Sequence, residues 1–562
     1  MNQTNTKTKP LSSSLVRFTL RTFLILIALC SIGAWHLGER YNQEIHFEAP
    51  QFWDTSNGDN IKWSTKLGSQ SYGTPGLSKD YVFVGTNNAG GYDPNFPPNI
   101  DSGVLLCFNK QTGKFVWQYS TEKLAIGRVS DWPLQGITGS PFAEDDRLWL
   151  VNNRGEVVCL DTDGFLDGVN DGVFQNEKSK TDTDADVIWS FDMIKQLGVF
   201  PHNMSHCNVA ADSQRLYIKT SNGVGQDHKS AKAPDAPSFV VLDKETGSVV
   251  WTDNRPGKSI MHASWGSAAI TTIHGRDQVL FPGGDGWLYS YEPAGDGNGK
   301  PLLLWKFDCN PKTSTFRLGG GKGRNNIFRA PTVFGNQIFL TMGQDPEHGG
   351  GPSRVWCIDP GTKTGDLSPT IVKRGEATQR PSIENQYRHC IVENGDKEIP
   401  NPQSAKGWEY EGGDYDGDGN LGPNEFFNRS LSKVTIANDC AFVTSIEGYL
   451  HCLDLKTGTL NWRHDMLAAT WNSPLVVGNS LFVSTEDGEV HLMVAHSDPN
   501  KAKIGQAAKF REFNDSSYYA EMTFENGVLY LVSRDRLTAI ADEKAIAEAL
   551  GLPEPKQKQG AK

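Results

Sequence analysis

The sequence predicts an all-β fold, an eight-bladed β-propeller, and three observations support it. One hairpin pattern recurs along the chain, and eight short motifs mark the starts of innermost strands. One further copy of the hairpin pattern is divided between the two ends of the repeat region. Repetition of one supersecondary unit is the sequence signature of solenoids and propellers. The divided copy indicates a closed ring rather than an open array.

The hairpin pattern is clearest in residues 107–117, 241–251 and 452–462, which align without a gap. Each segment has an Asp or Asn eight residues before a Trp, with Thr-Gly midway. An apolar run before the Asp is typical of a buried strand. The Asp accepts backbone N–H bonds in the turn, the Gly supplies a positive φ, and the Trp packs between sheets from the next strand. Degenerate copies include those that contain Asp161 and Asp359.

The innermost strands are marked by Ser/Thr-Pro-like dipeptides that precede apolar pairs of strands. These are Thr74-Pro75, Ser140-Pro141, Asn208-Val209, Ser267-Ala268, Ala330-Pro331, Ser432-Lys433, Ser473-Pro474 and Glu521-Met522, and they predict eight blades. Asp542 ends the last hairpin copy with no Trp after it, whereas Trp63 has no Asp copy before it. We therefore expect the strand that contains Trp63 to complete the last blade, which closes the ring and removes an exposed edge.

The N-terminus predicts export. Lys7, Lys9, Arg17 and Arg21 precede a short apolar run, which is the form of an export signal. We expect a cytoplasmic n-region at 1–22, a signal or transmembrane anchor at 23–37, a linker at 38–59, the propeller at 60–542, and a C-terminal helix with a disordered tail at 543–562. Because the basic side stays cytoplasmic, the propeller would face the periplasm or cell envelope, anchored in the membrane, or be secreted if the segment is cleaved.

Charge and cysteine positions limit the possible partners and cross-links. A net charge of −12 offers no basic face to phosphates, so nucleic acid is not expected as a partner. Four cysteines stand two residues before a repeat Asp or Asn, where another copy has Val241, and we interpret them as core residues: Cys107, Cys159, Cys357 and Cys452. The remaining candidates for pairing in an oxidising compartment are Cys207, Cys309, Cys390 and Cys440, and the sequence leaves their pairing open.

A calcium loop is predicted at residues 414–425, inside an expected insertion at 374–429. The pattern matches the EF-hand loop, with carboxylates at positions one, three and five, Gly419 at the sharp turn and a closing Glu. The predicted Ca2+ ligands are Asp414, Asp416, Asp418, Asn420 and Glu425. The segment before the loop does not have a helical pattern, so a full paired EF-hand is not expected. The site is predicted to be structural, and the alternative is an acidic surface turn.

A ring of aromatic residues is predicted at one mouth of the central channel. Three residues before the Pro-like position of each innermost strand the chain has Tyr72, Thr138, His206, Trp265, Phe328, Ser430, Trp471 and Tyr519. Six of these eight are aromatic or histidine, a lining that suits a flat or apolar ligand or a peptide. The candidate ligand-binding residues are Tyr72, His206, Trp265, Phe328, Arg329, Trp471 and Tyr519. The alternative is that these side chains simply plug the funnel of a large propeller.

Three basic residues and two histidines are further candidates in the same regions. Arg329, and the pair Lys322 and Arg324 in a glycine-rich loop, could hold an anion. His202 and His206 are four residues apart, but Pro201 and the following strand argue against a helix. The spacing of the two histidines therefore does not predict a zinc site.

The D-x-x-T-G-x-x-x-W hairpins resemble the repeats of the pyrroloquinoline-quinone (PQQ) type shared by quinoprotein alcohol dehydrogenases and BamB-like assembly factors. The resemblance covers most of residues 60–542 and implies either a binding or scaffold module or a PQQ-dependent dehydrogenase with its cofactor in the channel. The dehydrogenases characteristically carry adjacent cysteines over the cofactor. This chain has no adjacent pair among its nine cysteines and no C-x-x-C-H haem motif.

We therefore expect an exported, membrane-tethered propeller that acts as a binding or scaffold module, similar to BamB. A PQQ-dependent oxidoreductase is the alternative, and its catalytic residues are not identified in the sequence. A third alternative is a lyase or hydrolase that uses the neighbourhood of His206. The sequence favours it less than the other two functions, because no base and nucleophile are assembled there. The ligand or partner is left open.

Overall fold

The computed structural model describes residues 46–94, 96–316, 323–344, 349–376, 391–392, 395–415, 417–506, 508–511 and 516–555. The chain divides into two compact units, Glu48–Glu543 and a second unit made of Met1–Phe47 and Lys544–Lys562. The predicted n-region 1–22 and the predicted signal or anchor 23–37 lie outside the described residues. Within the described ranges, no helix has the length and apolar character needed to cross a membrane. The short helix α3 (Glu543–Ala549) follows the last strand.

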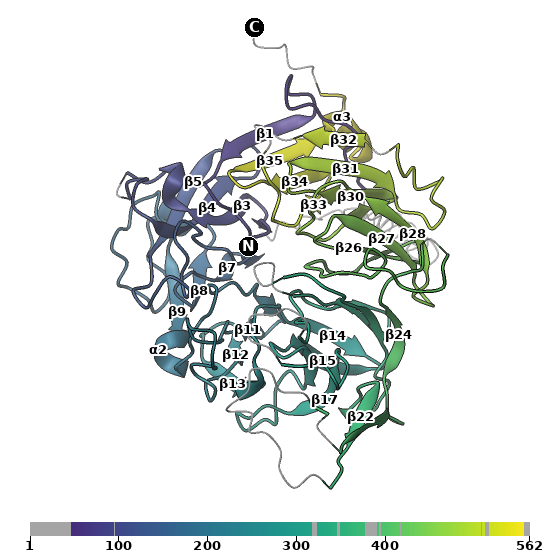
Figure 1. Cartoon of the computed structure of the whole chain (residues 1–562). Coiled ribbons are helices and arrows are strands. Elements are labelled where there is room, and N and C mark those ends of the chain that lie inside the picture. Colours follow the sequence, from purple (N-terminus) through teal and green to yellow (C-terminus); the bar gives the residue numbers. More distant parts are fainter. Residues whose placement is uncertain are drawn as a thin grey trace, which may run out of the picture. The chain divides into compact units, whose positions relative to one another are not determined.

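Eight antiparallel sheets, called blades here, follow one another around a ring in chain order (Figure 1). The first four blades, each written from its innermost strand outward, are β2 (Gly76–Leu77), β3 (Tyr81–Asn87), β4 (Ser102–Asn109) and β5 (Phe115–Glu122); β6 (Phe142–Glu144), β7 (Arg147–Val151), β8 (Glu156–Asp161) and β9 (Val187–Asp192); β10 (Ala210–Ala211), β11 (Arg215–Lys219), β12 (Phe239–Asp243) and β13 (Val249–Asp253); β14 (Ala269–Ile273), β15 (Arg276–Pro282), β16 (Trp287–Tyr291) and β17 (Leu303–Asp308).

The last four blades are β18 (Thr332–Phe334), β19 (Gln337–Thr341), β20 (Val355–Ile358) and β24 (Lys406–Tyr410); β25 (Thr435–Ala437), β26 (Cys440–Thr444), β27 (Tyr449–Asp454) and β28 (Leu460–Asp465); β29 (Leu475–Val477), β30 (Ser480–Ser484), β31 (Glu489–Val494) and β32 (Ala508–Arg511); β33 (Thr523–Glu525), β34 (Val528–Val532), β35 (Arg536–Ala541) and β1 (Ile61–Lys66). The eight-bladed all-β fold predicted from the sequence is confirmed.

The ring is closed by β1, the strand that contains Trp63. It pairs antiparallel with β35, with Trp63 opposite Ala539 and Lys66 opposite Arg536. The last blade is therefore built from both ends of the repeat region, as the divided hairpin pattern predicts. The Trp63 indole N–H donates to the carbonyl of Lys110 in the first blade at 3.0 Å, so this strand also joins the last blade to the first.

The hairpin pattern has a direct structural cause. The Asp243 carboxylate accepts bonds from the backbone N–H and the hydroxyl of Thr246, at 2.8 and 2.7 Å, and Asp454 holds Thr457 in the same way. Gly247 has φ of +68°, and a Cβ built on it would lie 2.6 Å from the ring of Trp189 in the preceding blade. The position therefore needs glycine both for its backbone conformation and for the neighbouring tryptophan.

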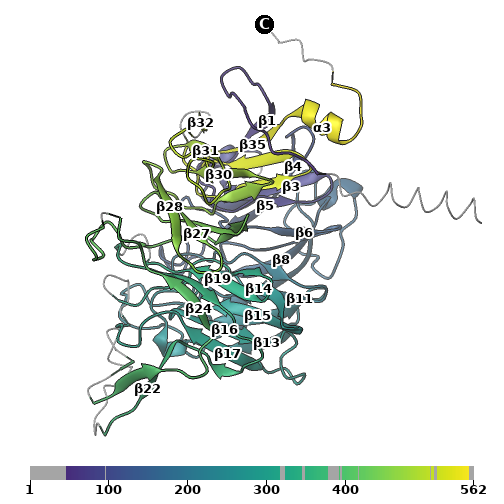
Figure 2. The same ribbon diagram turned by 90° about the vertical axis from the view of Figure 1, so that its right-hand side faces the viewer.

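Part of the predicted insertion at 374–429 belongs to a blade. β24 is the outer strand of the fifth blade, and Trp408 lies opposite Cys357 there, as Trp117 lies opposite Cys107 in the first blade. The extra chain instead lies before β24. It contains β21 (Gly365–Asp366), which pairs parallel with β17, and a hairpin of β22 (Thr370–Lys373) and β23 (Lys397–Pro400) at the periphery of the ring (Figures 1 and 2).

The described cysteines are buried free thiols. Cys107, Cys159, Cys357 and Cys452 are core residues, as their register predicts. Cys207, Cys309 and Cys440 are also buried and form no disulfide, which corrects the expectation that they could pair with one another. Their sulfur atoms belong to different blades and are held in separate apolar clusters. Cys390 lies outside the described residues.

The antiparallel order of each blade fixes which loops share a face. The inter-blade connections, from the outer strand of one blade to the innermost strand of the next, lie on the same face as the loops between second and third strands. We call this the pocket face. The D-x-x-T-G turns and the turns between first and second strands lie on the opposite face, which we call the hairpin face.

Candidate functional site

A pocket of about 300 Å³ lies on the pocket face and is lined by side chains from all eight inter-blade connections. Its lining residues are Tyr72, Trp132, Gln135, Thr138, Asn203, Met204, His206, Trp265, Phe328, Arg329, Leu431, Trp471 and Tyr519. The structure thus brings all seven candidate ligand-binding residues from the sequence together around one cavity. Of the eight positions in the predicted ring, Ser430 is the exception, since its buried hydroxyl donates to the Thr444 carbonyl at 2.6 Å.

The aromatic side chains form two groups on opposite sides of this pocket. Tyr519 stacks on Tyr72 at 5.1 Å between ring centroids and meets Trp471 edge to face at 5.2 Å. These three residues precede the eighth, first and seventh blades. Across the ring, Trp265 and Phe328, which precede the fourth and fifth blades, stack at 5.7 Å with an angle of 18° between their planes. Aromatic walls on two sides suit a flat or apolar group between them.

The polar and aromatic groups of the pocket are held in place by hydrogen bonds to backbone carbonyls and to Glu486. The Arg329 guanidinium donates from Nε to the Leu431 carbonyl at 2.7 Å and from Nη2 to the Trp471 carbonyl at 3.4 Å. Glu486 accepts bonds from the Trp471 indole at 3.0 Å and from the Tyr519 hydroxyl at 3.3 Å. These contacts fix the orientation of the aromatic rings before any ligand arrives, which lowers the entropic cost of binding.

Two ionisable groups at the mouth have shifted pKa values. Burial lowers the pKa of His206 to about 4, with further contributions from Arg329 and Lys219, so its imidazole is neutral at neutral pH. Burial acts to raise the pKa of Glu521, but Lys433 and Arg329 more than offset it and hold the value at about 2. Glu521 is therefore ionised at neutral pH. It forms an ion pair with Lys433 at 3.1 Å, and its negative charge also interacts with Arg329.

The prediction that Arg324 holds an anion is wrong. Its guanidinium is fully buried and pairs with Asp308, and Lys312 pairs with the same carboxylate at 2.8 Å. The side chain therefore neutralises a buried acid rather than presenting charge to a ligand. Lys322 lies outside the described residues.

His202 and His206 do not form a pair. His206 lines the pocket, whereas the Nε2 atom of His202 lies 2.8 Å from Nε2 of His262 and 2.9 Å from Nε2 of His228. The sequence reasoning missed His228 and His262 as partners of His202. Nothing in local spacing could have found them, because the three residues are 26 and 34 positions apart.

The predicted calcium loop follows a strand and not a helix. β24 ends at Tyr410, and a β-bridge between Gly412 and Phe426 closes the base of the loop. Glu425 is buried, and its two carboxylate oxygens accept bonds from the backbone N–H groups of Tyr415 at 2.6 Å and Gly422 at 2.5 Å. The closing Glu is therefore directed into the loop.

The first loop position is also directed inward. The Asp414 carboxylate accepts backbone N–H bonds from Gly417 at 2.7 Å, Asp418 at 3.1 Å and Gly419 at 2.8 Å. Gly419 has φ of +83°, the left-handed conformation expected of the sharp turn. Asp418 and Asn420 are also described and are exposed, whereas Asp416 lies outside the described residues. Calcium binding by this loop stays a prediction.

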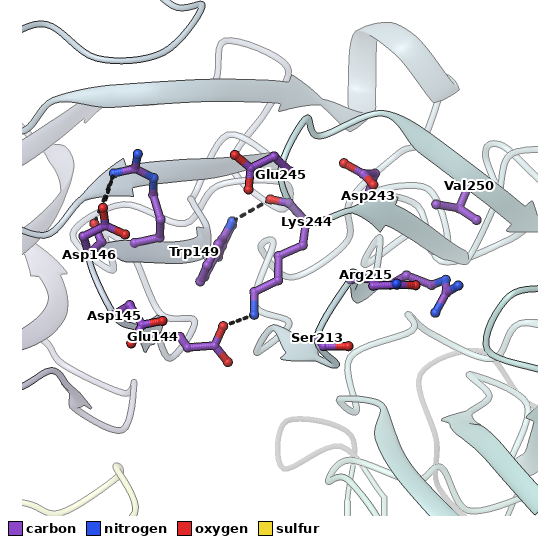
Figure 3. Close-up of a pocket in the computed structure, with 12 residues that line it drawn as sticks. Glu144, Asp145, Asp146, Trp149, Ser213, Arg215, Asp243, Lys244, Glu245 and Val250 are labelled. Atoms are coloured by element: carbon purple, nitrogen blue, oxygen red, sulfur yellow. Dashed lines mark hydrogen bonds and ion pairs between the residues drawn. The ribbon is translucent and has the colours of Figure 1, made fainter.

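A second hollow, of about 650 Å³, lies on the hairpin face between the second and third blades (Figure 3). Glu144 forms a salt bridge with the Lys244 ammonium there, and the Trp149 indole donates to the Lys244 carbonyl at 3.3 Å. The Lys244 ammonium also lies 4.8 Å from the centre of the Trp149 ring. These contacts join neighbouring blades, so the polar residues of this hollow act as an inter-blade joint.

The fold and the pocket define an eight-bladed β-propeller with an aromatic-lined pocket on one face. The sequence model of the family described as outer membrane protein assembly factor BamB matches residues 405–498, which contain β24 to β31, so this part of the chain is similar to PQQ-like repeats. No curated protein is similar enough in sequence to count as a match.

Several solved structures resemble the chain at low sequence identity. BamB from Moraxella catarrhalis is 14% identical, with 85% of this chain and 98% of that chain covered and a TM-score of 0.49. The computationally designed Ika8 protein is 9% identical, with 86% and 99% covered and a TM-score of 0.46. Sqt1 of Saccharomyces cerevisiae is 8% identical, with 86% and 98% covered and a TM-score of 0.48. The fold assignment accordingly rests on the sheets of this chain.

Proposed function

We propose that the propeller is a binding module that takes an apolar or aromatic side chain of a partner protein into the pocket. The observation that carries this proposal is that all eight inter-blade connections converge on one aromatic-walled cavity. A cavity of about 300 Å³ is at the small end of the range for ligand sites and suits one large side chain. The name of the matching family, an assembly factor, supports a scaffold role.

Exposed leucines in two loops of the pocket face favour a protein partner over a small molecule. Leu134 and Leu467 belong to inter-blade connections, are 56% and 80% exposed, and both have φ of +63°. A positive φ is uncommon for a bulky residue, and such backbone outliers cluster at active and binding sites. Met204, in the pocket wall, has φ of +73°. Apolar side chains outside the cavity extend the contact area beyond what a small ligand would use.

The proposal can be tested with displayed peptides. Random peptides on phage are selected on the immobilised protein, and the affinity of the enriched peptides is measured by fluorescence anisotropy. We expect peptides with an aromatic or large apolar residue, and binding at least about tenfold weaker in Trp471→Ala, in line with a binding hot spot. Phe334→Ala is the matched control, because Phe334 is 54% exposed on the hairpin face. Equal binding by both variants would reject the pocket as the site.

The pocket does not fit PQQ, the cofactor of the dehydrogenases whose repeats this chain resembles. PQQ is a planar polycarboxylate, whereas Arg329 is the one cationic side chain among the described residues that line the cavity. Two of its N–H groups already donate to backbone carbonyls. We therefore derive no redox step for this pocket.

We also propose that the loop 414–425 binds one Ca2+ in a structural role. The inward carboxylates of Asp414 and Glu425 support this, and the bridge at the base of the loop would hold them without flanking helices. The double variant Asp414→Ala, Glu425→Gln should lose one calorimetric site with an affinity on the order of 0.1–1 mM, while the circular dichroism of the propeller is retained. Equal Ca2+ binding by parent and double variant would contradict the assignment.

Export and membrane tethering complete the proposed function. The basic residues before the apolar run at 23–37 support an export signal or anchor. Residues 1–59 fused to alkaline phosphatase, which is active only after export, should give activity in the membrane fraction if the segment is an anchor and in the soluble exported fraction if it is cleaved. The same fusion lacking residues 23–37 should be inactive. An inactive full fusion would contradict export.

A further inference from the structure

We propose that His202, His228 and His262 bind a divalent transition-metal ion, with Zn2+ the ion that suits them best. The three residues come from the connection before the third blade, the loop between β11 and β12, and the connection before the fourth blade. All three lie on the pocket face. Their Nε2 atoms form a triangle with sides of 2.8, 2.9 and 3.4 Å.

Hydrogen bonding among the three rings cannot satisfy this triangle. In any protonation state, an imidazole Nε2 is either an N–H donor or a lone-pair acceptor. Among three nitrogens in mutual contact, at least two are therefore of the same kind, and their contact is repulsive. A cation at the centre, with all three nitrogens as lone-pair donors, removes every such conflict. This is the chemistry of an imidazole metal site.

The distances agree with tetrahedral coordination. Zn–N bonds are about 2.0–2.1 Å, so neighbouring nitrogens of a tetrahedral site are separated by about 3.3 Å. The observed separations of 2.8–3.4 Å require shifts of no more than a few tenths of an ångström to accept the ion. Three protein ligands leave the fourth position for water or a further donor, as in zinc sites that keep an open position.

The backbone around the three histidines brings them together. His202 N–H donates to the Ser221 carbonyl at 3.1 Å, and Val224 N–H donates to the His262 carbonyl at 2.8 Å, so one strand-like segment lies between the two buried histidines. At the centre of this segment is Gly223, where a Cβ would lie 2.5 Å from the His262 carbonyl oxygen and 2.6 Å from the His202 Cβ. Glycine at this position is what permits the close approach of His202 and His262.

The surroundings hold two rings firmly and leave the third accessible. The Trp265 indole donates to the His202 carbonyl at 3.0 Å, and its ring meets the His262 imidazole edge to face at 5.0 Å. His202 and His262 are buried, whereas His228 is half-buried in its loop and has φ of +52°. A metal ion would therefore enter from the side of His228, with the other two ligands already in place.

The test uses the full chain without a polyhistidine tag, stripped with a chelator and titrated with Zn2+ by calorimetry in saturating Ca2+. Co2+ serves as a spectroscopic probe, since tetrahedral Co2+ gives intense visible bands. We expect one Zn2+ per chain and tetrahedral Co2+ bands in the parent protein. In His228→Gln we expect these bands to be lost and Zn2+ to bind about 100-fold more weakly or worse, since weaker perturbations of metal sites already lower affinity 10–100-fold.

The controls separate ligation from folding. His228→Gln changes a half-buried loop residue, so its circular dichroism should match that of the parent. His274→Gln changes a histidine that pairs with Asp359 on the hairpin face at 2.9 Å, and it should bind Zn2+ as the parent does. A folded parent that binds neither Zn2+ nor Co2+ overturns the proposal, and so does a folded His228→Gln variant that binds both with parental affinity.

Discussion

Removing the strand that closes the ring should destroy the propeller as a monomer. β1 supplies five residues paired with β35, and it places Trp63, 8% exposed, between the last blade and the first. Without residues 61–67, β35 becomes an open edge and the first blade loses its tryptophan contact. Open, apolar sheet edges pair with other chains, so this deletion should aggregate.

A single substitution in the same strand should change the free energy of unfolding by an amount that can be measured. Truncating a buried tryptophan to alanine costs about 3–5 kcal/mol, and this range includes the loss of packing against the surrounding side chains. The Trp63 indole also donates a 3.0 Å hydrogen bond to the Lys110 carbonyl, and leaving that acceptor unsatisfied adds about 1 kcal/mol. We therefore expect Trp63→Ala to lower the free energy of unfolding by about 4–6 kcal/mol, a large fraction of the total for most domains.

The assay is denaturant unfolding followed by circular dichroism, with size-exclusion chromatography and light scattering for the deletion. Lys66→Ala is the matched control, because Lys66 is exposed on the same strand and its loss should change stability by less than about 0.5 kcal/mol. If the variant lacking residues 61–67 stays monomeric and unfolds with the parent, the closure argument is wrong.

Three further predictions concern the cofactor, pH and the histidine cluster. Added PQQ, with or without Ca2+, should give no dye-linked oxidation of alcohols or sugars; tight binding with turnover that is lost in Trp265→Ala or Trp471→Ala would contradict this. Because the folded-state pKa of Glu521 is about 2, against an ordinary 4.5, its contribution to stability is present above pH 4.5 and lost as pH falls toward 2. Glu521→Gln should therefore cost about 3 kcal/mol at most in urea unfolding at neutral pH, and a penalty that fails to shrink below pH 4.5 would refute the assignment. Gly223→Ala, which pushes the His202 and His262 backbones apart without removing a ligand, should weaken Zn2+ binding by about tenfold or more, as measured by calorimetry.

The blades were predictable because most of them repeat the same turn between their third and fourth strands. The turn that contains Asp243 and Gly247 needs the same residue types at the same spacing wherever a tryptophan from the preceding blade packs on it. The copy in the fifth blade was harder to find, because its tryptophan, Trp408, is separated from Cys357 by the inserted β21–β23 region. The spacing in sequence no longer identifies which tryptophan lies opposite a given cysteine once the connecting loop varies freely in length.

The pocket was predictable for a related reason. Tyr72, Trp265 and Tyr519 stand at the same register before their innermost strands, and the ring arrangement converts a shared register into a shared place in space. What the register could not provide was the orientation of each ring. Trp471 and Tyr519 are fixed by Glu486, a residue of the loop between β30 and β31 that occupies no position in the repeat pattern.

The histidine cluster shows where sequence periodicity stops being informative. His202 and His262 stand in successive inter-blade connections, but at different distances before their innermost strands, and His228 lies in a loop within a blade. The segment that contains Gly223 brings the three side chains together. It is paired with residues on both sides, through the bridges Pro201–Asn222 and Gly223–Ala263. A site of this kind depends on contacts between non-repeated loops, which differ from blade to blade. In repeat proteins, chemistry specific to one chain is therefore best sought where the loops depart from the repeat.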